Sequence, residues 1–150
     1  MSLNPVVNCT VAVPFNRQFP DALKADSMLV FCGRIPEDST FFVINLQDGK
    51  DPKNIPFHFG ARFEGGQDKI VYSNQQGADW AAMSEVCCDF GKRGSEFKLA
   101  FFIWNNCYQV CVNGKHSLIY DRAADMKIDT INIYGQVQIN SVKVYDLRCA

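Results

Sequence analysis

The sequence lacks the charge surplus and the long apolar runs that mark two broad classes of protein. Its 15 Lys and Arg residues against 16 Asp and Glu residues give a formal net charge of -1 at pH 7, whereas a protein that binds nucleic acid through phosphate contacts carries a basic surplus. The longest apolar run covers only residues 99–104, and a membrane-spanning helix needs about 20 apolar residues. The composition therefore predicts neither nucleic-acid binding nor membrane insertion.

The sequence also lacks a secretory pattern and a paired cysteine framework. Its first ten residues, MSLNPVVNCT, contain no basic segment followed by an apolar one, as a signal peptide would. The seven cysteines are odd in number and scattered, whereas secreted disulfide frameworks favour an even count. We therefore expect mostly free, buried thiols in a reducing, cytoplasmic compartment.

Spacing argues against a metal centre or a recognisable catalytic pair. Cys107 and Cys111 share one face of an expected strand but lie about 13 Å apart, too far for one zinc ion with bonds of about 2.3 Å. Glu85 and Asp89 are separated by a similar ~13 Å, beyond the ~5–10 Å of paired glycosidase carboxylates. We expect no metal and no catalytic residues, although a cysteine and a histidine that meet only in space stay open as a nucleophilic pair.

Apolar and polar residues alternate along much of the sequence, a period-2 pattern that is typical of half-buried strands. Asn113-Gly114 between two alternating runs predicts a hairpin. Only residues 122–127 hold a possible short helical turn. Many short strands predict a single all-β domain, an antiparallel sandwich or barrel. The expected strands cover residues 28–32, 41–46, 57–63, 69–73, 96–104, 108–112, 117–120, 130–134 and 136–145.

The segment FHFGARF, residues 57–63, shows the alternation most clearly. Its odd-numbered positions are apolar and are expected to face the core, whereas His58, Gly60 and Arg62 face solvent. Trp80 follows a loop, and an exposed aromatic ring can stack against the apolar face of a sugar. His58 and Arg62 suit sugar hydroxyls. The ordinary alternatives are a half-buried core tryptophan and a solvated strand face.

Residues 54–85, NIPFHFGARFEGGQDKIVYSNQQGADWAAMSE, resemble the galectin family, whose signature is H-x-N-x-R, then V-x-N, then W-G-x-E-x-R. The similarity covers residues 11–148. It implies a two-sheet antiparallel β-sandwich with jelly-roll topology, in which residues 11–150 form the carbohydrate-recognition domain after an N-terminal arm of residues 1–10. It also implies a lectin for β-galactosides without enzyme activity and without a cofactor, made in the cytosol and able to leave the cell by a leaderless route.

The resemblance assigns a role to each matching residue. His58 and Arg62 match the pair that holds the axial hydroxyl of galactose, Val71 matches the valine beneath the sugar, and Trp80 matches the stacking ring. Asn45, in the segment FFVINL, is a further candidate. These residues form the core of the expected sugar site.

Other positions depart from the family signature. Asn74 follows Ser73, which stands where the signature has its second asparagine, and is a candidate replacement for that asparagine. The alternation along the strand, however, points the Asn74 side chain to the other face. Glu85 is a candidate brace for Arg62. The departures are Gly60 and Ser73 in place of the two asparagines, Ala81 in place of the glycine, Met83 in place of the glutamate and Glu85 in place of the final arginine.

The lost polar contacts decide the expected affinity. Each is worth about 1 kcal/mol, or ~1.5–3 kcal/mol where a charge takes part. Four losses total roughly 4 kcal/mol, about a thousandfold in affinity. We therefore expect a lectin for glycans or glycoproteins with weak or altered lactose binding. The alternative is a galectin-fold protein without sugar activity that acts through protein contacts or as a homodimer.

Overall fold

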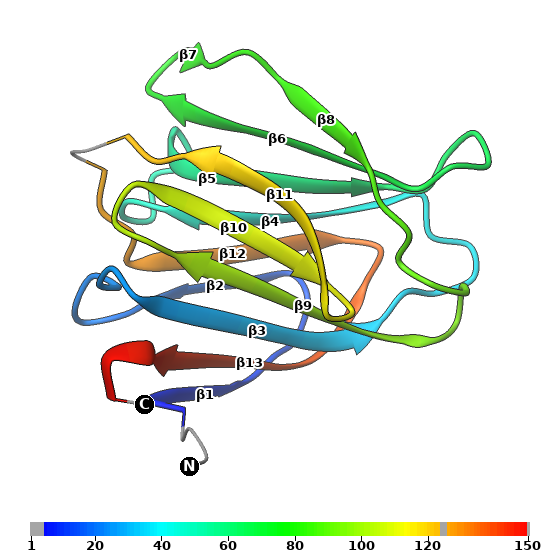
Figure 1. The fold of residues 1–150 in the computed structure, drawn as a ribbon, viewed down its shortest axis with the longest axis horizontal. Helices are drawn as coiled ribbons and strands as arrows, with labels where there is room; N and C mark the ends of the chain where they lie inside the picture. The colour runs from blue at the N-terminus through cyan, green and yellow to red at the C-terminus, as the bar shows by residue number, and fades with distance from the viewer. Residues whose placement is uncertain (1–4, 124–125, 150) are drawn as a thin grey trace.

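The computed structural model describes residues 5–123 and 126–149, and nearly all the regular structure in this part of the chain is β-strand. The strands form two antiparallel sheets packed face to face (Figure 1). This arrangement confirms the predicted all-β, two-sheet sandwich. The six-stranded sheet has the order β1-β13-β3-β9-β10-β11, with β1 (Val7–Thr10), β3 (Ser27–Arg34), β9 (Glu96–Ile103), β10 (Cys107–Val112), β11 (Lys115–Asp121) and β13 (Gln138–Asp146).

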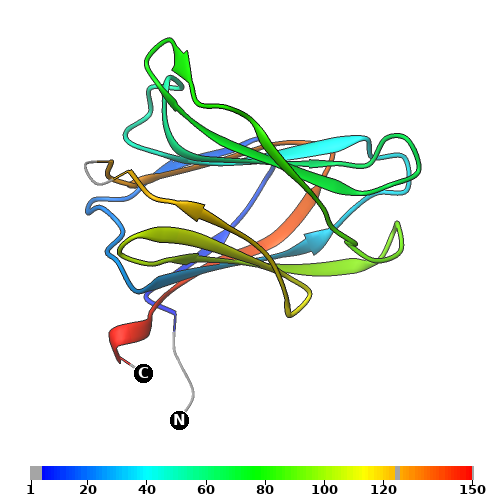
Figure 2. The ribbon, with the colours of Figure 1, turned by 45° about the horizontal axis from the view of Figure 1, so that its top comes forward.

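The seven-stranded sheet carries the expected site. Figure 2 shows its cyan and green strands forming one layer above the yellow and blue strands of the other sheet. The edge is irregular, because β7 and β8 both pair with β6. Its order is β2-β12-β4-β5-β6-β7, with β2 (Phe15–Gln18), β4 (Phe41–Gln47), β5 (Asn54–Arg62), β6 (Lys69–Gln76), β7 (Asp79–Trp80), β8 (Ser84–Cys87) and β12 (Thr130–Gly135).

Each predicted strand segment falls on an observed strand, and the differences concern short elements. The strands β1, β2 and β7 were not predicted, because they contain only four, four and two residues and are too short to show the alternation. Part of the expected N-terminal arm, Val7–Thr10, pairs with β13. The distance of about 13 Å between Glu85 and Asp89 assumed a regular strand, whereas β8 ends at Cys87.

The turns agree with the sequence where the structure describes them. Asn113 and Gly114 have φ values of 50° and 81°, as a two-residue hairpin turn between right-twisted strands requires. The expected turn at 122–127 includes residues 124 and 125, which lie outside the described residues. Beside them, the Met126 amide donates to the Ala123 carbonyl at 3.4 Å. Within the described residues the one helical segment is η1, Leu147–Cys149, and no helix could cross a membrane.

The core between the sheets is aromatic. Phe57 and Phe59 of β5 are fully buried and meet Tyr108 and Phe101 of the opposite sheet, with ring centroids 5.0 and 5.1 Å apart. Burying one such ring contributes about 1.5–3 kcal/mol. Because side chains alternate along a strand, this packing commits His58 between them to the outer face.

Two glycines are required by close backbone approach. A Cβ atom on Gly33 would lie 2.0 Å from the Gln138 carbonyl oxygen, beside a register shift between β3 and β13. Gly135 has a φ of 106°, and a Cβ there would lie 2.7 Å from the Phe42 Cα. Both sites hold strands closer than any other residue allows.

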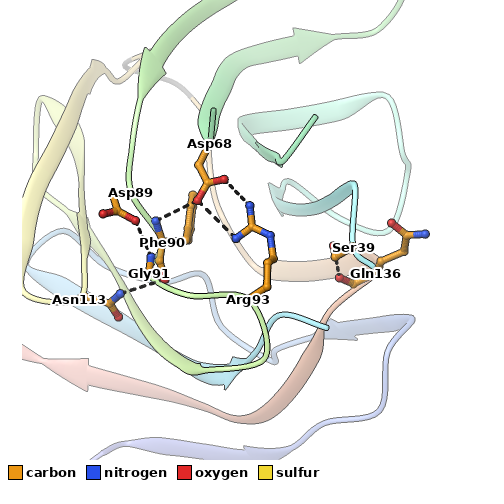
Figure 3. Close-up of polar contacts among 8 residues, drawn as sticks. All are labelled: Ser39, Asp68, Asp89, Phe90, Gly91, Arg93, Asn113 and Gln136. Carbon is orange, nitrogen blue, oxygen red and sulfur yellow. Dashed lines mark hydrogen bonds and ion pairs between the residues drawn. The ribbon is translucent and has the colours of Figure 1, made fainter. Parts of the chain in front are cut away.

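One end of the sandwich is held by polar contacts (Figure 3). The Arg93 guanidinium pairs with both carboxylate oxygens of Asp68 and lies 4.0 Å from the centroid of the Phe63 ring. The same carboxylate accepts from the Phe90 amide at 3.3 Å. Asn113 donates to the Phe90 carbonyl at 3.3 Å. This network joins the β5–β6 loop to the segment before β9 and to the β10–β11 hairpin.

The described cysteines correct one expectation. Six of them are free thiols, but only Cys9 is buried, whereas Cys87 is exposed and the rest are half-buried. The expectation of mostly buried thiols is therefore wrong. Three of the half-buried thiols, Cys32, Cys107 and Cys111, lie at positions that alternate with core residues in strands of the six-stranded sheet.

Candidate functional site

The expected site lies on the outer face of the seven-stranded sheet, the face that carries His58, Gly60 and Arg62. The strand register sets Asn45 and Ser73 opposite His58, and Val71 opposite Gly60. These side chains therefore share the outer face. Two hollows lie on this face, and His58 and Tyr134 line both of them.

His58 is held in one orientation and one charge state. Asn45 donates its amide to the Asn132 side-chain oxygen at 3.1 Å, which leaves the Asn45 oxygen to accept from His58 Nδ1 at 2.7 Å. Burial, helped by the nearby Arg62 charge, lowers the pKa of His58 from 6.5 to about 4. At neutral pH the ring is therefore neutral, with its proton on Nδ1 and Nε2 free to accept a hydrogen bond.

The first hollow lies over Gly60 and has a volume of about 320 Å³. A Cβ on Gly60 would lie 3.7 Å from His58 Nε2, so the free acceptor of His58 faces this hollow. Arg62 also lines it and has no ion pair or hydrogen bond to any described residue. The lining residues are Phe41, Phe42, Val43, His58, Gly60, Ala61, Arg62, Glu64, Val71 and Tyr134.

Glu85 does not brace Arg62. Its carboxylate lies 3.2 Å from the Lys69 ammonium, because Lys69 on β6 is closer to β8 than Arg62 on β5. Glu85 faces outward beside Val71, its register partner. The guanidinium of Arg62 is thus left with all its donors available.

Gly60 and Val71 depend on each other. A Cβ on Gly60 would lie only 2.9 Å from Val71 Cγ2, which is too close for the side chain as it stands. Val71 is nearly fully buried, at 5% exposed. An asparagine at position 60 would therefore require the Val71 side chain to shift.

Ser73 and Asn74 present no free group to a ligand on the outer face. Ser73 is fully buried, and its hydroxyl donates to the Ala81 carbonyl at 2.9 Å. Asn74 donates to the Tyr120 hydroxyl of the other sheet at 2.6 Å. The alternation therefore holds at Asn74, which faces the sandwich interior.

Trp80 is an exposed ring beside His58. It is 47% exposed, and its ring meets the His58 ring edge to face with centroids 5.1 Å apart. Met83 is 51% exposed and lines neither hollow, so it adds no apolar wall there. Trp80 is therefore about half-buried, as the alternative interpretation expected, but it is not part of the core between the sheets.

Trp80 lines the second hollow, which has a volume of about 330 Å³. Sequence reasoning missed most of its polar residues, because they come from four strands and one loop. Only the strand pairing reveals that Asn16, Asn132 and Asn45 lie in one row. The lining residues are Asn16, Asn45, Gln47, Lys50, Pro52, Ile55, His58, Gln75, Trp80, Asn132 and Tyr134.

A protein-family model of the galactoside-binding lectins matches residues 14–144. The chain belongs to the galactoside-binding lectin family. Galectin-8 of Rattus norvegicus is 32% identical to it over 144 residues, which cover 93% of this chain and 44% of the relative. Galectin-4 of Homo sapiens is 29% identical over 140 residues, which cover 92% of this chain and 42% of the relative. The chain thus spans less than half the length of these curated relatives.

Solved galectin structures share the fold. Sheep galectin-11, in complex with glycerol, superposes with a TM-score of 0.78 and 18% identity over 90% of this chain and 99% of that chain. Galectins are lectins that bind glycans and glycoproteins, not enzymes, so the expectation of a galectin-type carbohydrate-binding domain without enzyme activity is confirmed. The arm and domain boundaries expected from the sequence stay predictions.

Proposed function

We propose that this galectin-type domain is a lectin with a remodelled site and weak or altered binding of β-galactosides such as lactose. The observation that carries the proposal is that His58 and Arg62 both line the first hollow. A sugar hydroxyl there donates to the free Nε2 of His58 and accepts from the unpaired guanidinium of Arg62. Hydrogen bonds to a charged group are worth about 1.5–3 kcal/mol each.

The departures from the family signature support the altered preference. Gly60 has no side chain, Ser73 is bound to Ala81, and Glu85 is paired with Lys69. Met83 lines neither hollow. Four polar contacts are therefore absent, which lowers the affinity for lactose by roughly 4 kcal/mol, or about a thousandfold.

A glycan array tests the proposal, with the reduced protein in multivalent form beside Trp80→Ala. We expect glycan binding that disappears in this variant, since its ring is the exposed stacking surface. Trp104→Phe is the matched control, because Trp104 stacks on Phe102 of the other sheet and keeps a ring there. Equal binding by the wild type and Trp80→Ala would contradict the proposal.

A second candidate function is a protein interaction without sugar binding, and one observation favours it. Ile119 is 56% exposed on the outer face of the six-stranded sheet, in the same cross-strand row as Gln109 and Phe102. Ile119 and Phe102 are apolar side chains on either side of Gln109, and exposed apolar side chains suit contact with a protein partner or a second copy. Residence in the cytoplasm with leaderless export is compatible with either function and is likewise a proposal.

A further inference from the structure

A third hollow, with a volume of about 400 Å³, opens at one edge of the sandwich. Its lining comes from β1 and β13 of the six-stranded sheet, from β2 of the seven-stranded sheet and from the loop that joins β2 to β3. It shares no lining residue with the two hollows of the expected sugar site. The third hollow is therefore a separate site, placed where the edges of the two sheets meet.

Much of the lining of the third hollow is apolar. Phe19 and Val144 belong to the core, at 5% and 1% exposed, and both also line the hollow. Val6 lines it as well and is 63% exposed, so its side chain faces solvent beside these core residues. Pockets of about 300–1,000 Å³ with an apolar lining and a few polar groups are typical of small-molecule sites.

Arg17 lines the third hollow and is a charged residue on the inner face of its strand. Its register partner on β12 is Ile131, which is fully buried, and cross-strand partners point to the same face of a sheet. The guanidinium donates to Cys9 Sγ at 2.8 Å and lies 5.3 Å from the centroid of the Phe19 ring. No carboxylate among the described residues pairs with it. A thiol is a weak acceptor, so an anion would bind the remaining donors more strongly.

The charges around the third hollow favour an anion. Three cations line it, Arg17, Lys24 and Arg148, against two carboxylates, Asp21 and Asp146. Arg148 and Asp146 form an ion pair at 2.9 Å. Lys24 is exposed and has no ion pair with a described residue. Arg17 and Lys24 are therefore available to one negatively charged group.

We propose that the third hollow binds a free fatty carboxylate of medium chain length. The carboxylate accepts hydrogen bonds from Arg17 and Lys24. The hydrocarbon chain lies on Phe19 and Val144 and covers Val6, which is otherwise exposed. This site does not depend on the proposed lectin function, because its residues take no part in the sugar site.

The first test compares two probes with the same hydrocarbon chain, sodium decanoate and decan-1-ol, by ¹H–¹³C NMR. We expect decanoate to shift the methyl signals of Val6, Leu23 and Val144, all of which line the hollow. Decanol lacks the charge and should bind about tenfold more weakly or worse. The Trp80 indole signal should stay unmoved, since Trp80 lies on the expected sugar site.

The second test removes each cation in turn. Arg17→Met keeps an unbranched apolar stem beside Phe19, and we expect it to weaken decanoate binding at least about tenfold without changing decanol binding. Lys24→Met is a second variant with the same expected pattern at an exposed position. Lys115→Met is the matched control, because Lys115 is also exposed but lies on β11.

The third test weakens the apolar contact. Val6→Ser should reduce the affinity for decanoate and for decanol alike, by about fourfold, the value of burying one methylene group. Ile119→Ser is the matched control, since Ile119 is another exposed apolar residue, 56% exposed, on the six-stranded sheet.

Several outcomes would overturn the proposal. Decanoate that leaves the three methyl signals unmoved, or that shifts the Trp80 signal in their place, would show that the hollow is not its site. Equal affinities for decanoate and decanol, or wild-type affinity in both Arg17→Met and Lys24→Met, would remove the role of the cations. If decanoate affinity falls as the protein concentration rises while light scattering reports a dimer, a second copy covers the hollow and the proposal is wrong. Lactose binding measured beside each titration reports on the lectin function separately.

Discussion

Arg62 and Arg93 lie near the same β5–β6 loop and differ in how they are satisfied. Arg93 is paired with Asp68 and covers the Phe63 ring, whereas Arg62 lines a hollow without a partner among the described residues. Buried polar groups need partners, because an unpaired one costs free energy. An unpaired cation at a hollow is instead available to a ligand. Arg93 therefore belongs to a region that stabilises the fold, whereas Arg62 belongs to a surface that is available for binding.

The largest expected effect is on the stabilising arginine. Asp68→Ala leaves Arg93 three-quarters buried, at 25% exposed, without its carboxylate. We expect the free energy of unfolding to fall by about 3 kcal/mol, measured by urea denaturation. Glu96→Ala is the matched control, since Glu96 is 72% exposed and lies 3.6 Å from Arg34, and such pairs contribute less than about 1 kcal/mol. Equal losses in both variants would remove the distinction.

Removing the guanidinium of Arg62 is expected to weaken glycan binding and to leave the stability of the fold nearly unchanged. We expect Arg62→Met to weaken glycan binding by about 2 kcal/mol, roughly thirtyfold, because the hydroxyl loses its charged donor. The free energy of unfolding should change by less than about 0.5 kcal/mol, since no contact is broken. Titration calorimetry and urea denaturation measure the two quantities. A clear loss of stability would show that Arg62 has a structural partner.

The half-buried His58 ring is expected to make the stability of the fold depend on pH. Its pKa in the folded protein is about 4, below the ordinary value of 6.5, so the unfolded chain binds more protons between these values. Stability is therefore full above pH 6.5 and falls as the pH drops toward 4, by about 1 kcal/mol between pH 6 and pH 5. His58→Gln should flatten this slope in urea denaturation. His116→Gln, which removes the exposed histidine of β11, is the matched control.

The smallest expected effect tests the packing of Gly60. Gly60→Asn restores the family residue, but its Cβ meets Val71 Cγ2. We expect lactose affinity to stay within about twofold, since the clash offsets a contact worth ~1 kcal/mol. Gly60→Asn combined with Val71→Ala relieves the clash and should bind lactose more tightly than Gly60→Asn alone. Restoration by Gly60→Asn alone would mean that Val71 rotates freely.

The fold could be read from the sequence because alternation is a local property. His58 and Arg62 face outward since Phe57 and Phe59 face the core, and this needs no knowledge of pairing. Partners across strands could not be read in the same way. The bond between Ser73 and Ala81, the pairing of Glu85 with Lys69 and the row of amides beside Trp80 all depend on register and side-chain rotation.

Trp80 stands on the most weakly held strand of the seven-stranded sheet. β7 has two residues and pairs only with the end of β6, at the upper corner of Figure 1. Such an edge opens at a low local free energy, while central strands open only with the whole domain. Its amides should exchange with deuterium early, and a bound glycan should slow that exchange. We therefore expect the residence time of a bound glycan to shorten in variants that weaken the pairing of β7 with β6.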